Sequence, residues 1–232
     1  MNPIDRQKQA SAAAAALEIE DGMTVGLGTG STAAHFVTAL AQRAAAEKLR
    51  LRCVSTSRVT ADQAVGLGLT VLPLDDVETI DITVDGADEI GPGLSLIKGG
   101  GAALLREKLV WESSRRCIVI ADAAKVVATL GAFPLPVEVV AFGHTATARR
   151  IDAAIRALGL SAEPRLRIRD GVPVQTDSGQ LIYDLACGAL PDPVAVATAL
   201  KRITGVMDHG LFLGLASEAL VGGVNGVSRL GR

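Results

Sequence analysis

This sequence has few aromatic residues and few cysteines, and neither sign of charge is in large excess. Phe, Trp and Tyr make up 3% of its 232 residues, so aliphatic side chains must build the core. The formal net charge of -2 argues against a nucleic-acid-binding protein, because phosphate contacts need a basic face. Cys53, Cys117 and Cys187 form no C-x-x-C motif, and they indicate neither a disulfide framework nor a zinc site. They fit a reducing cytoplasm.

No segment indicates export or a membrane span. Residues 1–9 carry charge where a signal peptide needs an apolar core. Residues 22–42 lack Asp, Glu, Lys and Arg, but glycines and polar side chains interrupt them, which indicates buried protein structure. The composition, 49% hydrophobic and 21% charged, excludes disorder, and the length suits one large or two small domains. We therefore expect a cytoplasmic protein without membrane contact.

Strands alternate with helices over residues 1–130. Apolar runs predict strands at residues 23–27, 51–55, 70–74, 80–85, 94–97 and 117–121. Helical patterns cover residues 4–19, 32–46, 57–65 and 102–112, with Ser31 as the expected N-cap of the second helix. This alternation predicts an α/β fold with a mostly parallel sheet covered on both faces.

The pattern changes after the proline-rich residues 133–136. Strands are predicted at residues 137–142, 165–169, 172–176, 181–185 and 206–213, and helices at 145–158 and from Asp192-Pro193 onward. Asp170-Gly171 is the expected turn of a hairpin. This order resembles the split β-α-β, ferredoxin-like layout. We expect residues 131–213 to form a smaller α+β domain, with residues 214–232 returning to the sheet of residues 1–130.

A glycine-rich turn, Gly26-Leu-Gly28-Thr29-Gly30-Ser31-Thr32, links the first strand to the second helix. Its N–H groups and hydroxyls converge where the helix dipole favours an anion, which predicts a phosphate cradle. The alternative is a tight turn that binds nothing. A dinucleotide site is less favoured, because Ser31 replaces the third glycine of G-x-G-x-x-G and no acidic residue ends the second strand.

Three carboxylates lie within Asp85-Gly86-Ala87-Asp88-Glu89, where the fourth predicted strand ends. Ligands bind open α/β sheets at this edge, and the mutual repulsion of these groups indicates hydration, cations or a function. For Glu89 a solvated acidic turn is a serious alternative. The three histidines are far apart in sequence and give no metal-ligand spacing.

Lys98-Gly99-Gly100-Gly101 follows the next predicted strand and leads into a helix that carries Glu107. Three glycines allow the backbone to approach a ligand closely, and the lysine adds a compact charge. Glu107 is a candidate base, whereas Arg106 and Lys108 fit an ordinary charged helix face. Lys125 follows the sixth predicted strand, with a structural capping role as its alternative.

Taken together, the motifs resemble those of ribose-5-phosphate isomerase, type A. The resemblance is carried in order by Gly28-Thr-Gly-Ser-Thr32, Val84-Asp-Gly-Ala-Asp-Glu89, Ile97-Lys-Gly-Gly-Gly-Ala-Ala103 with Arg106-Glu-Lys108, Ala121-Asp-Ala-Ala-Lys125 and Phe133-Pro-Leu-Pro-Val-Glu138, and extended by Asp208-His-Gly-Leu-Phe212. Five ordered motifs are far more specific than any one of them.

The resemblance implies a Rossmann-like domain with a smaller α+β domain, no metal or organic cofactor, and a homodimer or homotetramer. It implies interconversion of ribose 5-phosphate and ribulose 5-phosphate through an enediolate. Glu107 would transfer the proton, and Asp85, Asp88 and Lys98 would contact the sugar. The residues expected at the phosphate are Ser31, Thr32, Lys125 and Lys8, of which Lys8 lies outside any distinctive motif. The remaining substrate contacts are expected at Thr29, Gly30, Gly86, Ala87, Gly99, Gly100 and Gly101.

Two other functions compete with this one. A non-catalytic sugar-phosphate sensor would keep the cradle but would not need Glu107, and it would normally bring an effector module. An amino-sugar phosphate deaminase of related architecture is disfavoured by the ordered motifs. The sequence also leaves open whether Asp85 or Asp88 opens the sugar ring.

Overall fold

The computed structural model describes residues 2–231 and divides the chain into two compact units. The first contains the residues up to Ala87, residues 106–126 and the residues from Gly214 onward. The second contains residues 88–105 and 127–213. The outermost residues of the expected first domain, 1 and 232, lie outside the described range.

The two units differ from the expected domains in residues 88–105 and 127–130, which belong to the second unit. Pairing between strands explains the larger difference. β5 (Glu89–Ile90) pairs with β6 (Leu96–Ile97), and β6 pairs with β14 (Leu211–Phe212), all antiparallel. The second unit ends at Leu213.

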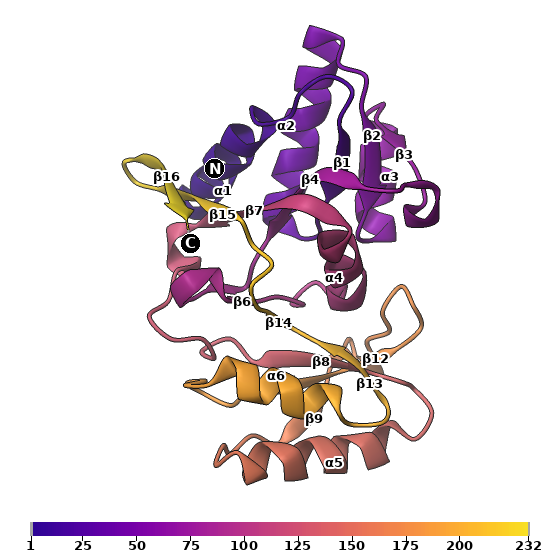
Figure 1. Cartoon of the computed structure of the whole chain (residues 1–232), viewed down its shortest axis with the longest axis vertical. Coiled ribbons are helices and arrows are strands. Elements are labelled where there is room, and N and C mark those ends of the chain that lie inside the picture. The colour runs from indigo at the N-terminus through magenta and orange to yellow at the C-terminus, as the bar shows by residue number, and fades with distance from the viewer. Residues whose placement is uncertain (1, 232) are drawn as a thin grey trace. The chain divides into compact units, whose positions relative to one another are not determined.

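The first unit is built on a seven-stranded sheet in the order β16-β15-β7-β4-β1-β2-β3 (Figure 1). The strands are β1 (Thr24–Leu27), β2 (Arg52–Ser55), β3 (Thr70–Val71), β4 (Ile80–Gly86), β7 (Ser114–Asp122), β15 (Glu218–Gly223) and β16 (Gly226–Gly231). Neighbours are parallel except β15 and β16, which form an antiparallel hairpin. The mostly parallel sheet and the return of the C-terminal segment are confirmed.

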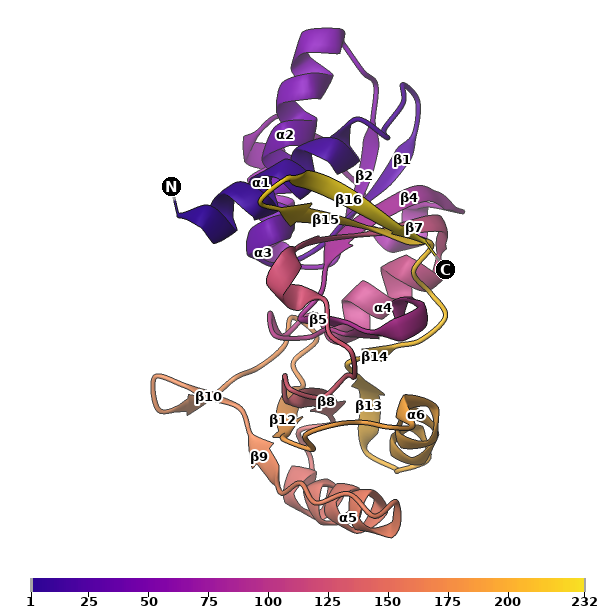
Figure 2. The ribbon, with the colours of Figure 1, turned by 90° about the vertical axis from the view of Figure 1, so that its left-hand side faces the viewer.

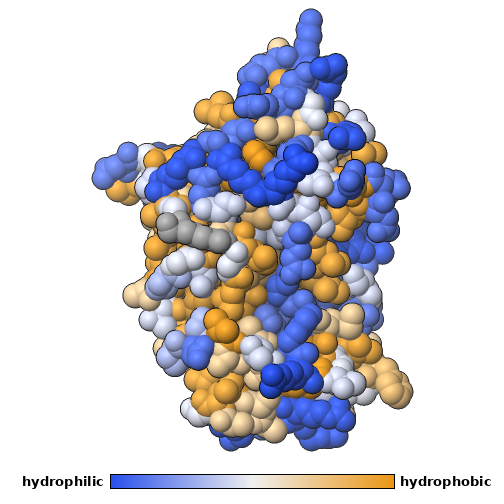
Figure 3. Space-filling model, in the orientation of Figure 1, coloured by the Kyte–Doolittle hydropathy of each residue, from blue (hydrophilic) through white to orange (hydrophobic). Residues whose placement is uncertain are grey.

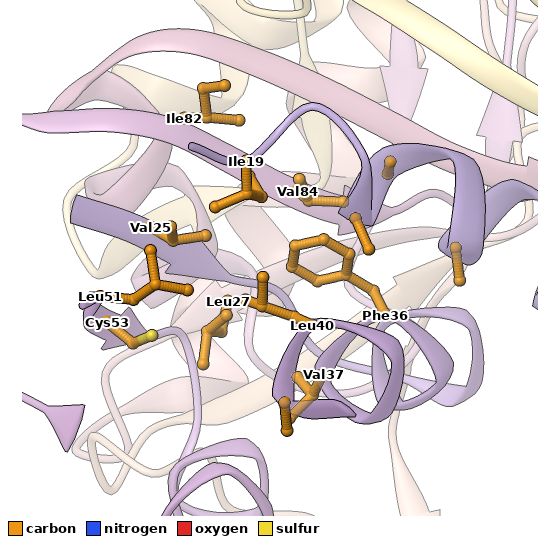
Figure 4. Close-up of a cluster of buried hydrophobic side chains, with 14 of the residues drawn as sticks. Ile19, Val25, Leu27, Phe36, Val37, Leu40, Leu51, Cys53, Ile82 and Val84 are labelled. Atoms are coloured by element: carbon orange, nitrogen blue, oxygen red, sulfur yellow. The ribbon is translucent and has the colours of Figure 1, made fainter. Parts of the chain in front are cut away.

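Four helices belong to this fold: α1 (Pro3–Ala16), α2 (Ser31–Glu47), α3 (Arg58–Gly66) and α4 (Leu104–Glu112). The core between the sheet and the first three of them is almost wholly aliphatic and includes Phe36 (Figure 4). Val110 of α4 packs instead against Val54, whose neighbour Cys53 faces the first cluster, so α4 lies on the opposite face of the sheet. The expected covering of both faces is confirmed.

Two local predictions in this unit are wrong. Ser31 is the first residue of α2 rather than its N-cap, because Gly30 takes the capping position with a φ of 107° that suits glycine. The third strand ends at Val71 instead of residue 74, since Leu74–Asp76 form a short 3₁₀ turn.

The second unit has a four-stranded antiparallel sheet in the order β13-β8-β12-β9. Along the chain come β8 (Leu135–Val139), α5 (His144–Ala157), β9 (Pro164–Leu166), β12 (Leu181–Leu185), α6 (Pro193–Lys201) and β13 (Val206–His209). The ferredoxin-like layout is thus confirmed. The side chain of Asp192 caps α6 as predicted, by accepting from the backbone N–H of Ala195 at 2.9 Å.

Two predicted strands in this unit are interrupted. The expected strand 165–169 divides at Arg167 into β9 and β10 (Ile168–Arg169), and β10 pairs with β11 (Val172–Pro173) as a separate hairpin (Figure 2). The expected strand 206–213 divides at Gly210, where β13 ends before β14. Both interruptions occur at residues that contact the Lys98 loop, described below.

Hydrophobic side chains lie among hydrophilic ones on the face of the protein drawn in Figure 3. Folded proteins generally expose apolar atoms in this way, so such residues alone mark no interface. None of the helices within residues 2–231 is long and apolar enough to cross a membrane.

A cluster of ion pairs joins Glu18, which follows α1, to strands β7, β15 and β16 of the sheet. Arg116 donates to Glu18 at 3.0 Å and to Glu218 at 2.9 Å, and Arg229 pairs with both carboxylates. Hydrogen bonds from Arg229, aided by Arg116 and opposed by burial, hold the pKa of Glu18 below its ordinary value of 4.5. Glu18 therefore stabilises the folded state above pH 4.5, and this contribution is lost as the pH falls through the lower, folded-state pKa.

As the pH is lowered from about 5 to 3, we expect the free energy of unfolding to decrease less steeply in Glu18→Gln than in the parent. Denaturant titrations across this range measure it. Parallel curves for the two proteins would show that Glu18 contributes nothing to acid sensitivity.

Candidate functional site

The glycine turn lies at the carboxyl end of β1, against the end of β4. The backbone N–H of Gly28 donates to the carbonyl of Val84 at 3.0 Å. A Cβ on Gly28 would lie 2.1 Å from Oδ1 of Asp85 and 2.6 Å from its Cα, so only glycine fits there. At Gly28, the close approach of the turn is therefore to Asp85 of the protein itself.

A network of hydroxyl groups holds the turn from the side of β2. Oγ1 of Thr29 lies 2.6 Å from Oγ1 of Thr56 and donates to Oγ of Ser57 at 2.8 Å. Oγ1 of Thr60 donates to the carbonyl of Gly28 at 2.9 Å. Sequence reasoning assigned no role to residues 57–60, although hydroxyl side chains at the end of a strand next to β1 were a usable signal.

The first turn of α2 carries an exposed hydroxyl, a half-buried one and a nearby cation. Nζ of Lys8 donates to Oγ of Ser31 at 3.0 Å. Thr32 is half-buried and lies beside Gly86: a Cβ added to Gly86 would be 4.0 Å from the Cβ of Thr32. The structure therefore brings Lys8, which no motif marked, to the expected phosphate cradle, where the helix N-terminus adds a favourable dipole for an anion.

Asp85 is fully buried and serves as an anchor for the turn. Its Oδ1 accepts from the N–H groups of Thr29, at 3.0 Å, and Gly86, at 2.7 Å. Its Oδ2 accepts from the indole of Trp111 at 3.3 Å. Sequence reasoning missed Trp111, the single tryptophan of the chain, because nothing in its spacing relates it to β4.

Glu107 and Lys125 complete the candidate residues of the first unit. Glu107 lies in the first turn of α4 with 3% of its surface exposed, and Lys125 is half-buried at the end of a 3₁₀ turn, Ala123–Lys125. The side chain of Asp122 accepts from the N–H of Ala124 at 3.1 Å. Asp122 is therefore the N-cap of that turn.

The second unit holds Asp88 and the loop Lys98-Gly99-Gly100-Gly101. Oδ2 of Asp88, which is half-buried, accepts from the N–H of Gly100 at 2.8 Å. The backbone N–H of Lys98 donates to Gly210 at 2.8 Å. The side chain of Lys98 is 2% exposed, and its Nζ lies 5.4 Å from the centre of the Phe212 ring, within range of a cation–π contact. Lys98 is therefore held at both backbone and side chain.

Glu89 has a structural role instead. It is buried, and its two oxygens accept from the backbone N–H groups of Gly131, at 2.6 Å, and Phe133, at 2.5 Å. The alternative of a solvated acidic turn is wrong for this residue. Glu89 satisfies two backbone donors that would otherwise be costly to bury.

Residues 2–231 contain no group of three or more His, Cys, Asp and Glu side chains able to hold a metal ion. The first unit offers an anion cradle, lysines and buried carboxylates, and the second offers a lysine, glycine N–H groups and a carboxylate. The chain crosses from the first unit to the second between Ala87 and Asp88, and returns between Leu105 and Arg106. The groups of the first unit, an anion cradle with buried carboxylates and lysines, suit acid–base chemistry on a phosphorylated substrate.

Residues 52–226 match the family model of ribose 5-phosphate isomerase A (phosphoriboisomerase A). The chain is 62% identical over 226 residues to a protein of Caulobacter sp. (strain K31) named ribose-5-phosphate isomerase A. That alignment covers 97% of this chain and 98% of the relative.

Two solved structures are similar over almost their whole length. The ribose 5-phosphate isomerase of Plasmodium falciparum has a TM-score of 0.93 and 35% identity, covering 99% of each chain. A D-ribose-5-phosphate isomerase in complex with phospho-erythronic acid has a TM-score of 0.92 and 35% identity, covering 100% of each.

Proposed function

This chain belongs to the ribose 5-phosphate isomerase A family, and from that premise we propose how its residues divide the reaction. It is an aldose–ketose isomerase that interconverts ribose 5-phosphate and ribulose 5-phosphate. The reaction takes a proton from C2 of the aldose and returns a proton to C1 through an enediolate. The comparisons give no support to the sensor alternative.

The phosphate is held at the start of α2 in this proposal. The supporting observation is that an exposed hydroxyl, Ser31, a half-buried one, Thr32, and the ammonium of Lys8 meet at a helix N-terminus. Backbone N–H groups and the helix dipole there favour a dianion. Thr29 and Gly30 shape the turn, and Lys125 supplies a second cation.

We expect Ser31→Ala with Thr32→Ala to raise KM for ribose 5-phosphate more than it lowers kcat. The reason is that the phosphate is bound alike in the ground state and the transition state, so its loss weakens uniform binding. Steady-state kinetics on the double variant measure both constants. An equal penalty on a sugar substrate without phosphate would show that the hydroxyls only support the turn.

Ring opening falls to Asp88 rather than Asp85 in this proposal. Asp85 is fully buried, and both its oxygens accept hydrogen bonds that hold the turn and Trp111. Asp88 is half-buried and is oriented by the N–H of Gly100. A carboxyl group reachable by the substrate is better suited to exchange a proton with the ring oxygen than one enclosed by protein donors.

Proton transfer falls to Glu107 and oxyanion stabilisation to Lys98 with the N–H groups of Gly99–Gly101. Two observations support this assignment. Glu107, a base, is buried, and Lys98, a compact cation, is buried and held through both its backbone and its side chain. Away from bulk water, a fixed donor acts strongly on a developing negative charge. Gly86 and Ala87, which follow Asp85, contact the substrate in this proposal.

Incubation of purified protein with ribose 5-phosphate, followed by detection of ribulose 5-phosphate, tests the function. We expect full activity after exhaustive chelation, because Lys98 and the loop N–H groups take the place of a Lewis acid in this mechanism. Loss of activity on chelation, restored by a divalent ion, would contradict the metal-free mechanism.

We further propose that the protein works in the cytoplasm as a homodimer or homotetramer. Support for a reducing compartment comes from the three cysteines, which form no disulfide. Burial raises the pKa of Cys53 to about 12 and that of Cys187 to about 11, so neither thiol is ionised at neutral pH. Light scattering on the eluted protein decides the oligomeric state.

A further inference from the structure

The side chain of Arg167 joins the glycine loop to the four-stranded sheet of the second unit. It follows β9 at the point where the predicted strand is interrupted, and it is 12% exposed. Its Nη1 donates to the carbonyl of Gly99 at 2.7 Å and to that of Gly100 at 3.3 Å. One guanidinium nitrogen thus holds two consecutive carbonyls of the loop.

Asp184 fixes the direction of this guanidinium. The Nε of Arg167 donates to Oδ2 of Asp184 at 2.8 Å, and Nη2 donates to Oδ1. A planar guanidinium that binds a carboxylate through two parallel hydrogen bonds has its orientation set by that carboxylate. Nη1 is then directed at the loop, a geometry that a lysine ammonium could not reproduce.

The peptide group between Gly99 and Gly100 links Arg167 to Asp88. Its carbonyl accepts from Arg167, and its N–H donates to Oδ2 of Asp88 at 2.8 Å. The loop itself has three glycines and no side chain that could secure it between Lys98 and Ala102, and glycine is the residue that loses most conformational freedom on ordering. The position of this peptide therefore depends on contacts from outside the loop.

We propose that Arg167, oriented by Asp184, is a positioning residue for the isomerase reaction. It holds the Gly99–Gly100 peptide and, through its N–H, the carboxylate of Asp88. This inference rests on the proposed function, in which Asp88 opens the sugar ring and the loop N–H groups face the enediolate. The other end of the loop is held independently, by the N–H of Lys98 donating to Gly210 at 2.8 Å.

A purely structural role makes a different prediction. If Arg167 only ties the β10–β11 hairpin to β12, its removal lowers thermal stability and leaves the kinetics of the folded enzyme unchanged. If it positions the loop, its removal disturbs Asp88 and the oxyanion donors without touching the cradle at α2. In that case kcat falls while the phosphate still binds.

The test compares Arg167→Ala and Arg167→Lys with the parent and with Arg169→Met, which removes an exposed arginine of the same hairpin. We expect Arg167→Ala to lower kcat by about 10- to 100-fold, the scale of a misplaced catalytic group. Inhibition by inorganic phosphate should be unchanged, and Arg169→Met should match the parent. Added guanidinium should restore part of the lost kcat in Arg167→Ala, whereas Arg167→Lys should remain impaired.

Hydrogen–deuterium exchange of the peptide covering residues 97–104 provides a readout independent of activity. Faster exchange in Arg167→Ala, with the rest of the second unit unchanged, is expected because the peptide loses its external contact. Should Arg167→Ala fail to fold, Asp184→Asn, which loosens the guanidinium without removing it, takes its place in both measurements.

If the parent is active and the folded Arg167→Ala variant has a normal kcat, the positioning role alone is overturned. Unchanged exchange in the loop, or an equal loss in Arg169→Met, would also overturn it. An inactive parent would overturn the proposed function instead, and the two failures are therefore distinguishable.

Discussion

Replacing Glu107 with glutamine is expected to lower kcat for ribose 5-phosphate by about 10²- to 10⁴-fold, the range lost with a general base. Glutamine keeps the shape of the side chain but cannot accept the C2 proton. Because the phosphate cradle is formed by other residues, binding of substrate should change little. Stopped assays that measure kcat and KM, together with a thermal melt, separate the two effects.

Glu112→Gln is the matched control, since Glu112 lies on the same helix and is exposed. We expect its kinetics to equal those of the parent. Normal turnover in a folded Glu107→Gln variant would make Glu107 a buried helix residue without a part in catalysis, and the mechanism would have to be abandoned.

Lys98→Met is expected to lower kcat by about 10²- to 10³-fold, roughly 3–4 kcal/mol, as when one oxyanion donor is removed. Methionine fills a similar volume beside Phe212 but carries no charge for the enediolate oxygen. Because the contact forms mainly in the transition state, kcat and kcat/KM should fall together while substrate affinity stays nearly constant.

Lys125→Met is the comparison for this variant, because Lys125 is assigned to the phosphate. Its expected effect is a raised KM with kcat largely kept. If Lys98→Met instead raises only KM, Lys98 is another phosphate ligand and its catalytic assignment must be withdrawn.

The sequence predicted the fold well where one periodicity covers a whole element. Alternating strands and helices gave the parallel sheet, and the capping sequence Asp192-Pro193 gave the start of α6. The interruptions at Arg167 and Gly210 were not predicted; polar and apolar residues alternate straight through Arg167. They follow from tertiary contacts: Gly210 lies so close to Lys98 that an added Cβ would be 2.2 Å from its carbonyl oxygen.

The candidate site was predictable where motifs carry it and not where partners are distant in sequence. Glycine turns and carboxylates marked the ends of β1 and β4 directly. The contacts of Trp111 with Asp85 and of Arg167 with Gly99 join residues 26 and 68 positions apart. Neither residue belongs to a motif with its partner, so only the folded chain reveals these supports.

Prolonged incubation of ribose 5-phosphate in D₂O tests the central claim, proton transfer by Glu107 through an enediolate, most directly. With the parent enzyme, deuterium should accumulate at C2 of the aldose and C1 of the ketose over many turnovers, as read by NMR. Glu107→Gln should incorporate it more slowly by the factor lost in kcat. Rapid isomerisation by the parent without any deuterium in either sugar would indicate hydride transfer and contradict this account.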